Sequence, residues 1–196
     1  MLQEGEHLGS CRLRRAKIKP GRKLTAYFDV SVGGTGRQRR LRPIAVTWAP
    51  PGEANPQAEV GPHPMEVEAH HAGLAAPFRD LQANVPESGM RIVVSPLDPR
   101  FPQLVRMSDP AQVHDMLAEN RPASARSKAP CRVSTVRYRP GRRHVLRYDI
   151  GDGGGRDGGS ETIFAKLYRN GESQGAVRLA EAIAEATQLL RQEFSR

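Results

Sequence analysis

The chain has 196 residues, of which 38% are hydrophobic and 5% aromatic, and its formal net charge is +9. This length allows one domain or two small ones with a modest apolar core, and the charge favours anionic partners such as nucleotides, nucleic acid or an acidic protein surface. No apolar run approaches the ~20 residues of a membrane span, and neither a disulfide framework nor a signal peptide is indicated, so a reducing cytoplasm is the expected location.

The first element along the chain is a hairpin with a basic turn, Cys11 to Val30 (CRLRRAKIKPGRKLTAYFDV). A similar hairpin lies 120 residues later, Cys131 to Ile150 (CRVSTVRYRPGRRHVLRYDI), and six of the twenty positions are identical. The identities include the cysteine, the Pro-Gly-Arg of the turn and the aspartate near the end. Chance similarity between two basic strands would not fix these residues together, so we interpret the pattern as an internal duplication.

An apolar strand is predicted after each hairpin, beyond a glycine-rich gap. It is Pro43 to Ala49 in the first copy and Ile163 to Tyr168 in the second, where the gap is Gly151 to Ser160. In the alignment of the two copies, Thr47 stands where the second has Lys166. A lysine in an apolar strand either needs an anionic partner or extends its ammonium into solvent.

The region between the two copies is rich in turns. Pro50 to Pro64 is predicted to be an exposed loop, and Met65 to Leu81 is expected to hold a short helix that ends before Pro77. Met90 to Ser95 (MRIVVS) is predicted to be a short buried strand, and the segment after it, Pro96 to Pro102, a rigid series of turns.

Two further helices are predicted. Asp109 is expected to be the N-cap of the first, with Pro110 at its first position, and Val113, Met116 and Leu117 on its apolar face. The second, Gly175 to Glu193, has an apolar stripe at helical spacing with Glu181 and Glu185 on its flank. The elements together predict an α+β fold of two related antiparallel β-rich subdomains: residues 1–119 with the connecting helix, a linker at 120–130, and residues 131–196, which end in the long helix.

The order of hairpin, lysine strand and glutamate helix in the second subdomain resembles the small N-terminal lobe of protein-kinase-like folds. More specifically, YRPGRRHVLRYDI followed by IFAKLYRNG resembles the N-lobe of the aminoglycoside phosphotransferase and choline kinase-like family. An actinobacterial-type branch of that family resembles the chain over most of its length, from Cys11 to Glu193. The resemblance implies ATP-dependent transfer of a phosphoryl group to a small-molecule hydroxyl, with Mg²⁺ as cofactor.

The resemblance also implies a nucleotide site. Gly141 in the hairpin turn would let the backbone approach phosphate, with Arg142 beside it, and Lys166 would pair with the phosphates nearer the ribose. Glu181 would hold that lysine in place, and Glu185 has almost equally suitable spacing.

The catalytic aspartate, the asparagine and the metal-binding aspartate of this family lie in a second, mostly helical lobe. Because the chain ends at Arg196, it is expected to lack that lobe and to be inactive alone. It is then a fragment, a pseudoenzyme, or half of a split enzyme whose partner is a separate catalytic lobe. Asp115 and Asn120 mimic the catalytic-loop spacing, but they precede the lysine strand and Asp115 falls on a predicted helix. No catalytic residue is therefore assigned.

Two other functions stay open. The basic runs Arg12 to Lys23 and Arg37 to Arg42 suit a nucleic-acid-binding module, although few aromatic residues are interleaved for base stacking, which makes this the less favoured partner. A protein-interaction role is the other, because an isolated small lobe would expose the surface that meets its large lobe. Arg142 also has a simpler interpretation as a solvated turn charge, since the first copy has Arg22 at the equivalent position.

Structural roles are expected for some other reactive residues. Cys11 and Cys131 are predicted to be small buried apolar residues at equivalent positions. His70 and His71 have no partner ligands at metal-binding spacing, so no metal site is assigned to them.

Overall fold

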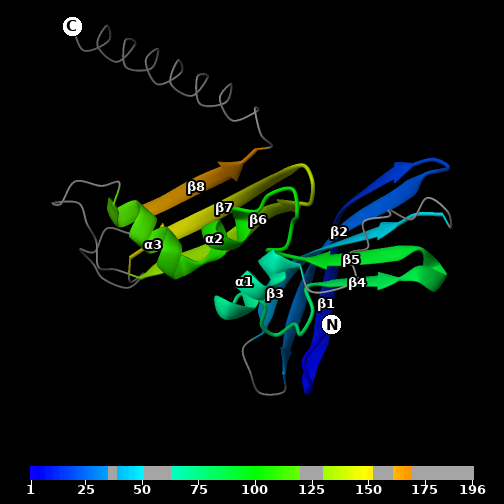
Figure 1. Ribbon diagram of the computed structural model, residues 1–196, viewed down its shortest axis with the longest axis horizontal. Helices are drawn as coiled ribbons and strands as arrows, with labels where there is room; N and C mark the ends of the chain where they lie inside the picture. Colours follow the sequence, from blue (N-terminus) through cyan, green and yellow to red (C-terminus); the bar gives the residue numbers. More distant parts are fainter. Residues whose placement is uncertain (35–38, 51–62, 120–129, 152–160, 169–196) are drawn as a thin grey trace, which may run out of the picture.

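The computed structural model describes residues 1–34, 39–50, 63–119, 130–151 and 161–168. Within these ranges the protein is rich in strands, which form two antiparallel sheets, and its helices are short (Figure 1). The expected α+β class is confirmed at this level. Among the described residues, no helix combines the length and the apolar composition needed to cross a membrane.

The first sheet contains five antiparallel strands in the order β1-β2-β3-β5-β4. These strands are β1 (Glu6–Lys19), β2 (Lys23–Gly34), β3 (Arg40–Trp48), β4 (Gln82–Val85) and β5 (Met90–Val94), and a short 3₁₀ turn, η1 (Pro86–Ser88), joins the last two along the chain. The strands β2, β3 and β5 alternate between two faces, so the sheet has one apolar face and one face that is largely polar.

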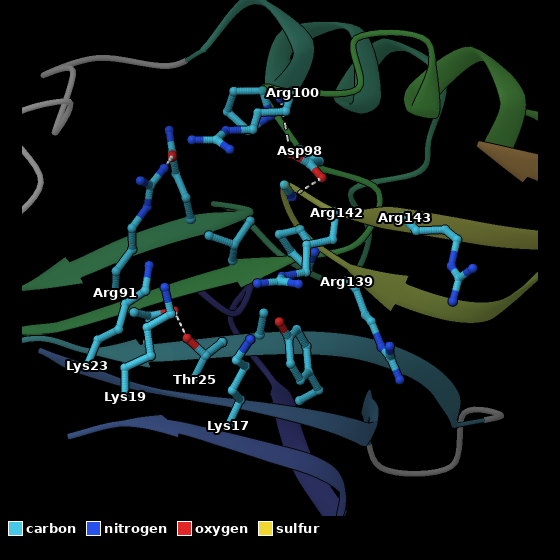
Figure 2. A pocket seen from close by; sticks show the side chains of 18 of the residues that line it. Lys17, Lys19, Lys23, Thr25, Arg91, Asp98, Arg100, Arg139, Arg142 and Arg143 are labelled. Carbon is cyan, nitrogen blue, oxygen red and sulfur yellow. Dashed lines mark hydrogen bonds between the residues drawn. The ribbon is translucent and has the colours of Figure 1, made fainter. Parts of the chain in front are cut away.

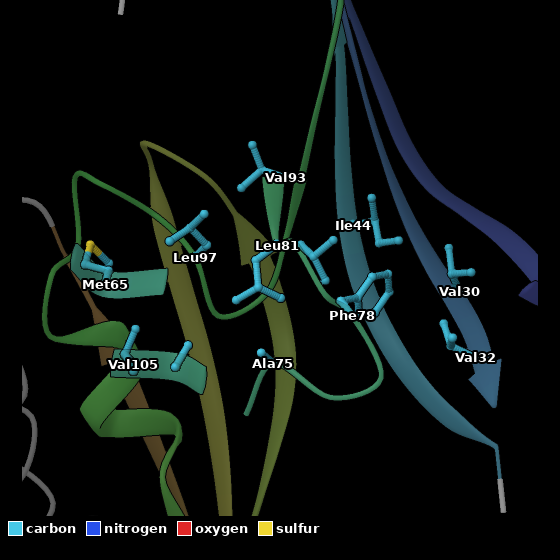
Figure 3. Packing of buried hydrophobic residues seen from close by; sticks show 12 residues of the cluster. Val30, Val32, Ile44, Met65, Ala75, Phe78, Leu81, Val93, Leu97 and Val105 are labelled. Carbon is cyan, nitrogen blue, oxygen red and sulfur yellow. The ribbon is translucent and has the colours of Figure 1, made fainter. Parts of the chain in front are cut away.

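The apolar face packs against α1 (Pro64–His71) and the segments that follow α1 and β5 (Figure 3). The core formed there includes Val30, Val32, Ile44, Met65, Ala69, Phe78, Leu81, Val94, Leu97 and Val105. The short helix expected after Met65 is thus present. It ends at His71 because Gly73 follows in a left-handed conformation, φ +68°, and its amide donates to His70 O.

A half-buried arginine joins two loops at the edge of this core. Arg42 donates hydrogen bonds to Ala76 O at 3.1 Å and to Ser95 O at 2.6 Å, and its guanidinium lies 5.6 Å from the centre of the Phe78 ring. Burial lowers the pKa of Arg42 to about 10, so the side chain is still charged at neutral pH. Its role is to satisfy backbone carbonyls inside the first subdomain.

The second sheet contains β6 (Cys131–Arg139), β7 (Arg143–Ile150) and β8 (Glu161–Leu167) in that order. One face of β7 is buried, as its alternation predicts: His144, Leu146, Tyr148 and Ile150. Two helices, α2 (Leu104–Ser108) and α3 (Pro110–Glu119), contribute to the core on this face. That core includes Ala45 of the first sheet together with Phe101, Leu104, Val113, Tyr138, Leu146, Tyr148 and Leu167.

The predicted start of α3 is confirmed. Asp109 Oδ1 accepts from the Ala111 amide at 2.9 Å, and Asp109 O accepts from the Val113 amide at 3.0 Å. Val113 is buried on the face turned to the second sheet.

The two hairpins have the same register at both ends. The turn glycines Gly21 and Gly141 have φ +68° and +71°, values that glycine adopts without strain. Pairs at equivalent positions are Lys19 with Lys23 and Arg139 with Arg143, then Cys11 with Val30 and Cys131 with Ile150. The first strand of each hairpin contains a bulge, which lies between Leu13 and Arg15 in β1 and between Thr135 and Arg137 in β6.

One expectation is wrong and several fall outside the described residues. Cys11 was predicted to be buried, but it is exposed, because β1 is an edge strand whose residues from Ser10 to Lys19 are all exposed; Cys131 is half-buried. The described part of the chain excludes 120–129 of the linker, 152–160 of the glycine-rich loop, most of the loop at 50–64, and the helix at 175–193.

Candidate anion-binding cleft

A cleft of about 840 Å³ lies between the polar face of the first sheet and the turn of the second hairpin (Figure 2). The sheet forms its floor. Opposite the floor are the segment Asp98 to Arg100, which follows β5, and the β6–β7 turn, Arg139 to Arg143. His63 and Tyr168 complete the lining. The volume lies in the range of about 300–1,000 Å³ that is typical of small-molecule sites.

One row of side chains crosses the floor from strand to strand. Lys17 pairs with Thr25, Thr25 with Thr47, Thr47 with Arg91, and Arg91 with Asn84. Directly opposed residues of antiparallel strands point to the same face, so one residue from each of the five strands faces the cleft, and all five line it. The hydroxyl oxygens of Thr25 and Thr47 are 3.3 Å apart.

Positive charge is concentrated around this floor. Eight lysine and arginine side chains line the cleft: Lys17, Lys19, Lys23, Arg91, Arg100, Arg139, Arg142 and Arg143. Both hairpins contribute, and Lys19 and Lys23 of the first occupy the positions that Arg139 and Arg143 occupy in the second. Figure 2 shows Arg142 reaching from its turn over the first sheet, on the side where the lysines lie.

These cations are close enough to repel one another. The pKa of the Lys17 ammonium lies below its ordinary value, and the largest cause is the positive charge of Arg142 across the cleft. Burial lowers the pKa of Arg139, with further contributions from neighbouring arginines. Like charges disfavour the protonated form of each group, so a bound anion would remove an existing repulsion.

Asp98 is the one acidic residue among the described residues that line the cleft, and it is engaged within the protein. Its Oδ2 accepts from the Gly141 amide at 2.7 Å and lies 2.7 Å from His144 Nε2, while Oδ1 accepts from the Arg100 amide at 3.0 Å. Asp98 is 1% exposed and His144 is fully buried. The carboxylate therefore fixes the turn that carries Arg142 and Arg143.

A buried tyrosine reinforces the same junction. Tyr138 donates to Leu97 O at 2.5 Å, next to Asp98 along the chain. Burial, followed by the negative charge of Asp98, raises the pKa of Tyr138 well above its ordinary value. The phenol thus stays protonated and remains a donor.

Two of the residues expected at a nucleotide site, Gly141 and Arg142, line this cleft. The amide of Gly141 already donates to Asp98, so the groups of this turn that could bind an anion in the cleft are the arginine side chains and not that amide. Glu181 and its alternative Glu185 lie outside the described residues.

Lys166 lies elsewhere. Its side chain is exposed on the face of the second sheet opposite the core, and it is not part of the cleft. It pairs with Val145 as Thr47 pairs with Thr25, which agrees with the alignment of the two copies. Exposed Phe164 lies two residues before it on the same strand. The exposure of Lys166 agrees with the alternative in which its ammonium extends into solvent.

Sequence reasoning missed Asp98 and Arg91, and it assigned the lysines of β1 and β2 only to a possible nucleic-acid-binding surface. The available signals were the repeated basic turn and a lone acid inside the rigid PLDPRFP segment. Neither signal shows that the two turns and this acid converge, because their contacts join segments more than forty residues apart.

The chemistry of the lining suits phosphate better than a metal ion. Among the described residues, no group of three or more His, Cys, Asp or Glu side chains is placed to hold a metal. Magnesium prefers carboxylate and phosphate oxygens, and the one carboxylate of the described lining, Asp98, is engaged within the protein.

Comparison of the chain with protein-family models, with curated proteins and with solved structures gives no match. What the chain binds is therefore inferred from the charges and geometry of the cleft.

Proposed function

We propose that the chain binds a nucleoside polyphosphate such as ATP in the basic cleft, and that it is the nucleotide-binding portion of a small-molecule phosphotransferase. The observation that carries the proposal is the convergence of eight cations from two hairpins, β5 and the loop that follows β5 on one small-molecule-sized cleft. Lysine and arginine are the usual partners of phosphate oxygens, and charge-assisted hydrogen bonds are among the strongest in proteins.

The proposal assigns binding and leaves catalysis to other residues. Asp98, the one acid among the described lining residues, accepts from Gly141 and Arg100 and contacts His144, so it is not free to act as a base. Transfer of a phosphoryl group to a hydroxyl would need carboxylates and Mg²⁺ held by a partner lobe. The kinase-like N-lobe fold and the small-molecule acceptor belong to the same proposal, supported by the family resemblance.

Nucleic-acid binding is the second candidate, favoured by one observation. The edge strand β1 exposes five cationic side chains along its length: Arg12, Arg14, Arg15, Lys17 and Lys19. A phosphate backbone laid along β1 could contact several of them, with a steep dependence on salt. This stripe lies partly outside the cleft, so variants separate the two candidates.

The experiment is calorimetric titration of the full chain with ATP, with and without Mg²⁺, at low salt. Arg142→Gln combined with Lys19→Gln removes one cation from each hairpin turn and is expected to weaken binding about 10-fold or more, since a charged hydrogen bond contributes about 1.5–3 kcal/mol. Arg12→Gln with Arg132→Gln is the matched control outside the cleft and should leave ATP affinity within about twofold.

Two further titrations distinguish the alternatives. Lys166→Ala should leave ATP binding unchanged if the nucleotide occupies the cleft, whereas loss of binding would move the site to the outer face of the second sheet. A single-stranded oligonucleotide that binds more tightly than ATP, and that is released by the control pair, would favour the nucleic-acid candidate. Absence of ATP binding to the unmodified chain would refute the proposal.

A further inference from the structure

The charges of the cleft are arranged around an uncharged centre. On the floor, the row that crosses the sheet begins with Lys17 and contains Arg91 near its other end. Between these two cations lie Thr25 and Thr47, and beyond Arg91 lies Asn84. The remaining cations come from the hairpin turns and from Arg100. A ligand that filled the cleft would therefore meet cations at its ends and hydroxyl groups in the middle.

Hydroxyl and amide groups recognise a different chemistry from that of lysine and arginine. An ammonium or guanidinium only donates hydrogen bonds, and ionised phosphate oxygens only accept them, whereas threonine and asparagine side chains do both. If one of the two threonines donates to the other across their 3.3 Å separation, the pair still has a hydrogen to donate and lone pairs that can accept. The matching ligand group is a hydroxyl.

One buried donor within this row is unsatisfied. The Nε of Arg91 is shielded from solvent and has no hydrogen-bond partner, while its Nη2 lies at the long distance of 3.5 Å from Gln82 Oε1. Buried donors in native structures are nearly always paired. The guanidinium of Arg91 therefore has hydrogen-bonding capacity that the described residues do not use.

Threonines are common in strands, and a cross-strand threonine pair can be purely structural. The duplicated hairpin provides an internal comparison. The positions equivalent to Thr25 and Thr47 in the second sheet hold Val145 and Lys166, which pair in the same register. A three-stranded unit of this kind therefore forms without the two hydroxyls, so the fold does not require threonine at these positions.

We infer that the row of Thr25, Thr47, Arg91 and Asn84 binds the hydroxyl-bearing sugar of the nucleotide, and that the cleft thereby selects an organic polyphosphate over an inorganic one. The inference rests on the proposed function, because it assigns the uncharged part of the same ligand. It makes Thr25 and Thr47 residues that determine specificity, and it leaves the turn cations to bind phosphate.

The test uses three probes that each carry a linear triphosphate: ATP, 2′,3′-dideoxy-ATP and inorganic tripolyphosphate. ATP and its dideoxy analogue have the same charge and the same base, so their ratio measures recognition of the sugar hydroxyls alone. The full chain is expected to bind ATP about 10-fold more tightly than the dideoxy analogue, which corresponds to one or two hydrogen bonds.

The double variant Thr25→Val, Thr47→Val removes both hydroxyls and keeps the branched shape that suits a strand. It should lower ATP affinity to that of the dideoxy analogue and leave tripolyphosphate affinity within about twofold, since neither turn loses a cation. Thr162→Val on β8, outside the cleft, is the matched control and should change none of the three affinities. Thermal unfolding followed by circular dichroism establishes that both variants are folded.

The outcomes separate this inference from the proposed function. Sugar recognition would be contradicted if the unmodified chain bound ATP and the dideoxy analogue equally well. It would also be contradicted if the double variant bound both as tightly as the unmodified chain does. Neither result would contradict phosphate binding. If none of the three probes binds, the proposed function fails and the inference fails with it.

Discussion

Asp98 and His144 meet at the junction of the two sheets, with Asp98 Oδ2 2.7 Å from His144 Nε2. Asp98 follows β5 of the first sheet and His144 begins the buried face of β7 in the second. The same carboxylate oxygen accepts from the Gly141 amide, so this contact sets where the basic turn lies above the floor of the cleft.

We expect Asp98→Asn to destabilise the protein by about 2–4 kcal/mol, because an amide cannot replace a buried carboxylate that accepts from two backbone amides and contacts His144. Urea unfolding followed by tryptophan fluorescence or circular dichroism measures the change. Asp149→Asn is the control: that carboxylate contacts Arg147 and Thr162 at the surface, and its loss should destabilise the protein much less than the loss of Asp98. An equal decrease in the free energy of unfolding of the two variants would show that the buried Asp98 carboxylate stabilises the fold no more than a surface carboxylate does.

The two turn glycines give a second, matched comparison. Gly21→Ala should cost about 1 kcal/mol, because alanine is strained at positive φ while open space surrounds the new methyl group. At Gly141 the backbone strain would be the same, and the added Cβ would also lie 3.3 Å from Arg100 Cδ. The amide of the same residue donates to Asp98. We expect Gly141→Ala to be the more destabilising by urea unfolding and to weaken ATP binding, with Gly21→Ala close to the unmodified chain in binding.

The pKa of Lys17 reports directly on the distance between the two hairpins. It lies below the ordinary lysine value mainly because of Arg142, so Arg142→Gln should raise it, since removal of a positive neighbour favours the charged ammonium. Titration of the Lys17 side chain by heteronuclear NMR measures the shift. Arg132→Gln, on the far part of β6, should leave it unchanged. A Lys17 pKa indifferent to Arg142 would mean that the turns do not approach one another in solution.

Alkaline pH should destabilise the second sheet. Burial raises the pKa of Tyr148 to about 12, so the folded state holds this proton more tightly than the unfolded chain, whose tyrosines ionise near 10. The stability that results is fully present below about pH 10 and is lost as pH rises towards 12. The free energy of unfolding should fall across this window, and that of the Tyr148→Phe variant should fall less steeply. Complete phenolate absorbance in the native protein by pH 10 would contradict this expectation.

The parts of the fold that could be predicted from sequence are those determined by neighbouring residues. Pro-Gly turns, the alternation of β7 and the Asp109 cap act over a few positions, and each is present in the structure. The strand β4 (QANV) lacks apolar alternation, and the five residues of α2 are too few to show helical periodicity, so both were missed.

The candidate site was only half predictable for a related reason. Gly141 and Arg142 belong to a recognisable turn, but the floor depends on β4 and β5 pairing beside β3, which no local pattern in the chain specifies. Lys166 attracted attention as a lone charge in an apolar strand. Within the described residues, however, the second sheet has one open face, and a lysine on that face needs no buried partner.

The shared register of the two copies places equivalent residue pairs on the two sheets. Thr25 with Thr47 and Val145 with Lys166 are the same pair of positions in the two copies of the hairpin and its following strand. In the folded chain the turn of the second hairpin lies over the first of these surfaces, whereas Lys166 on the second is exposed. The repeated hairpin therefore supplies both part of the floor of the cleft and the wall opposite it, and β4 and β5 complete the floor.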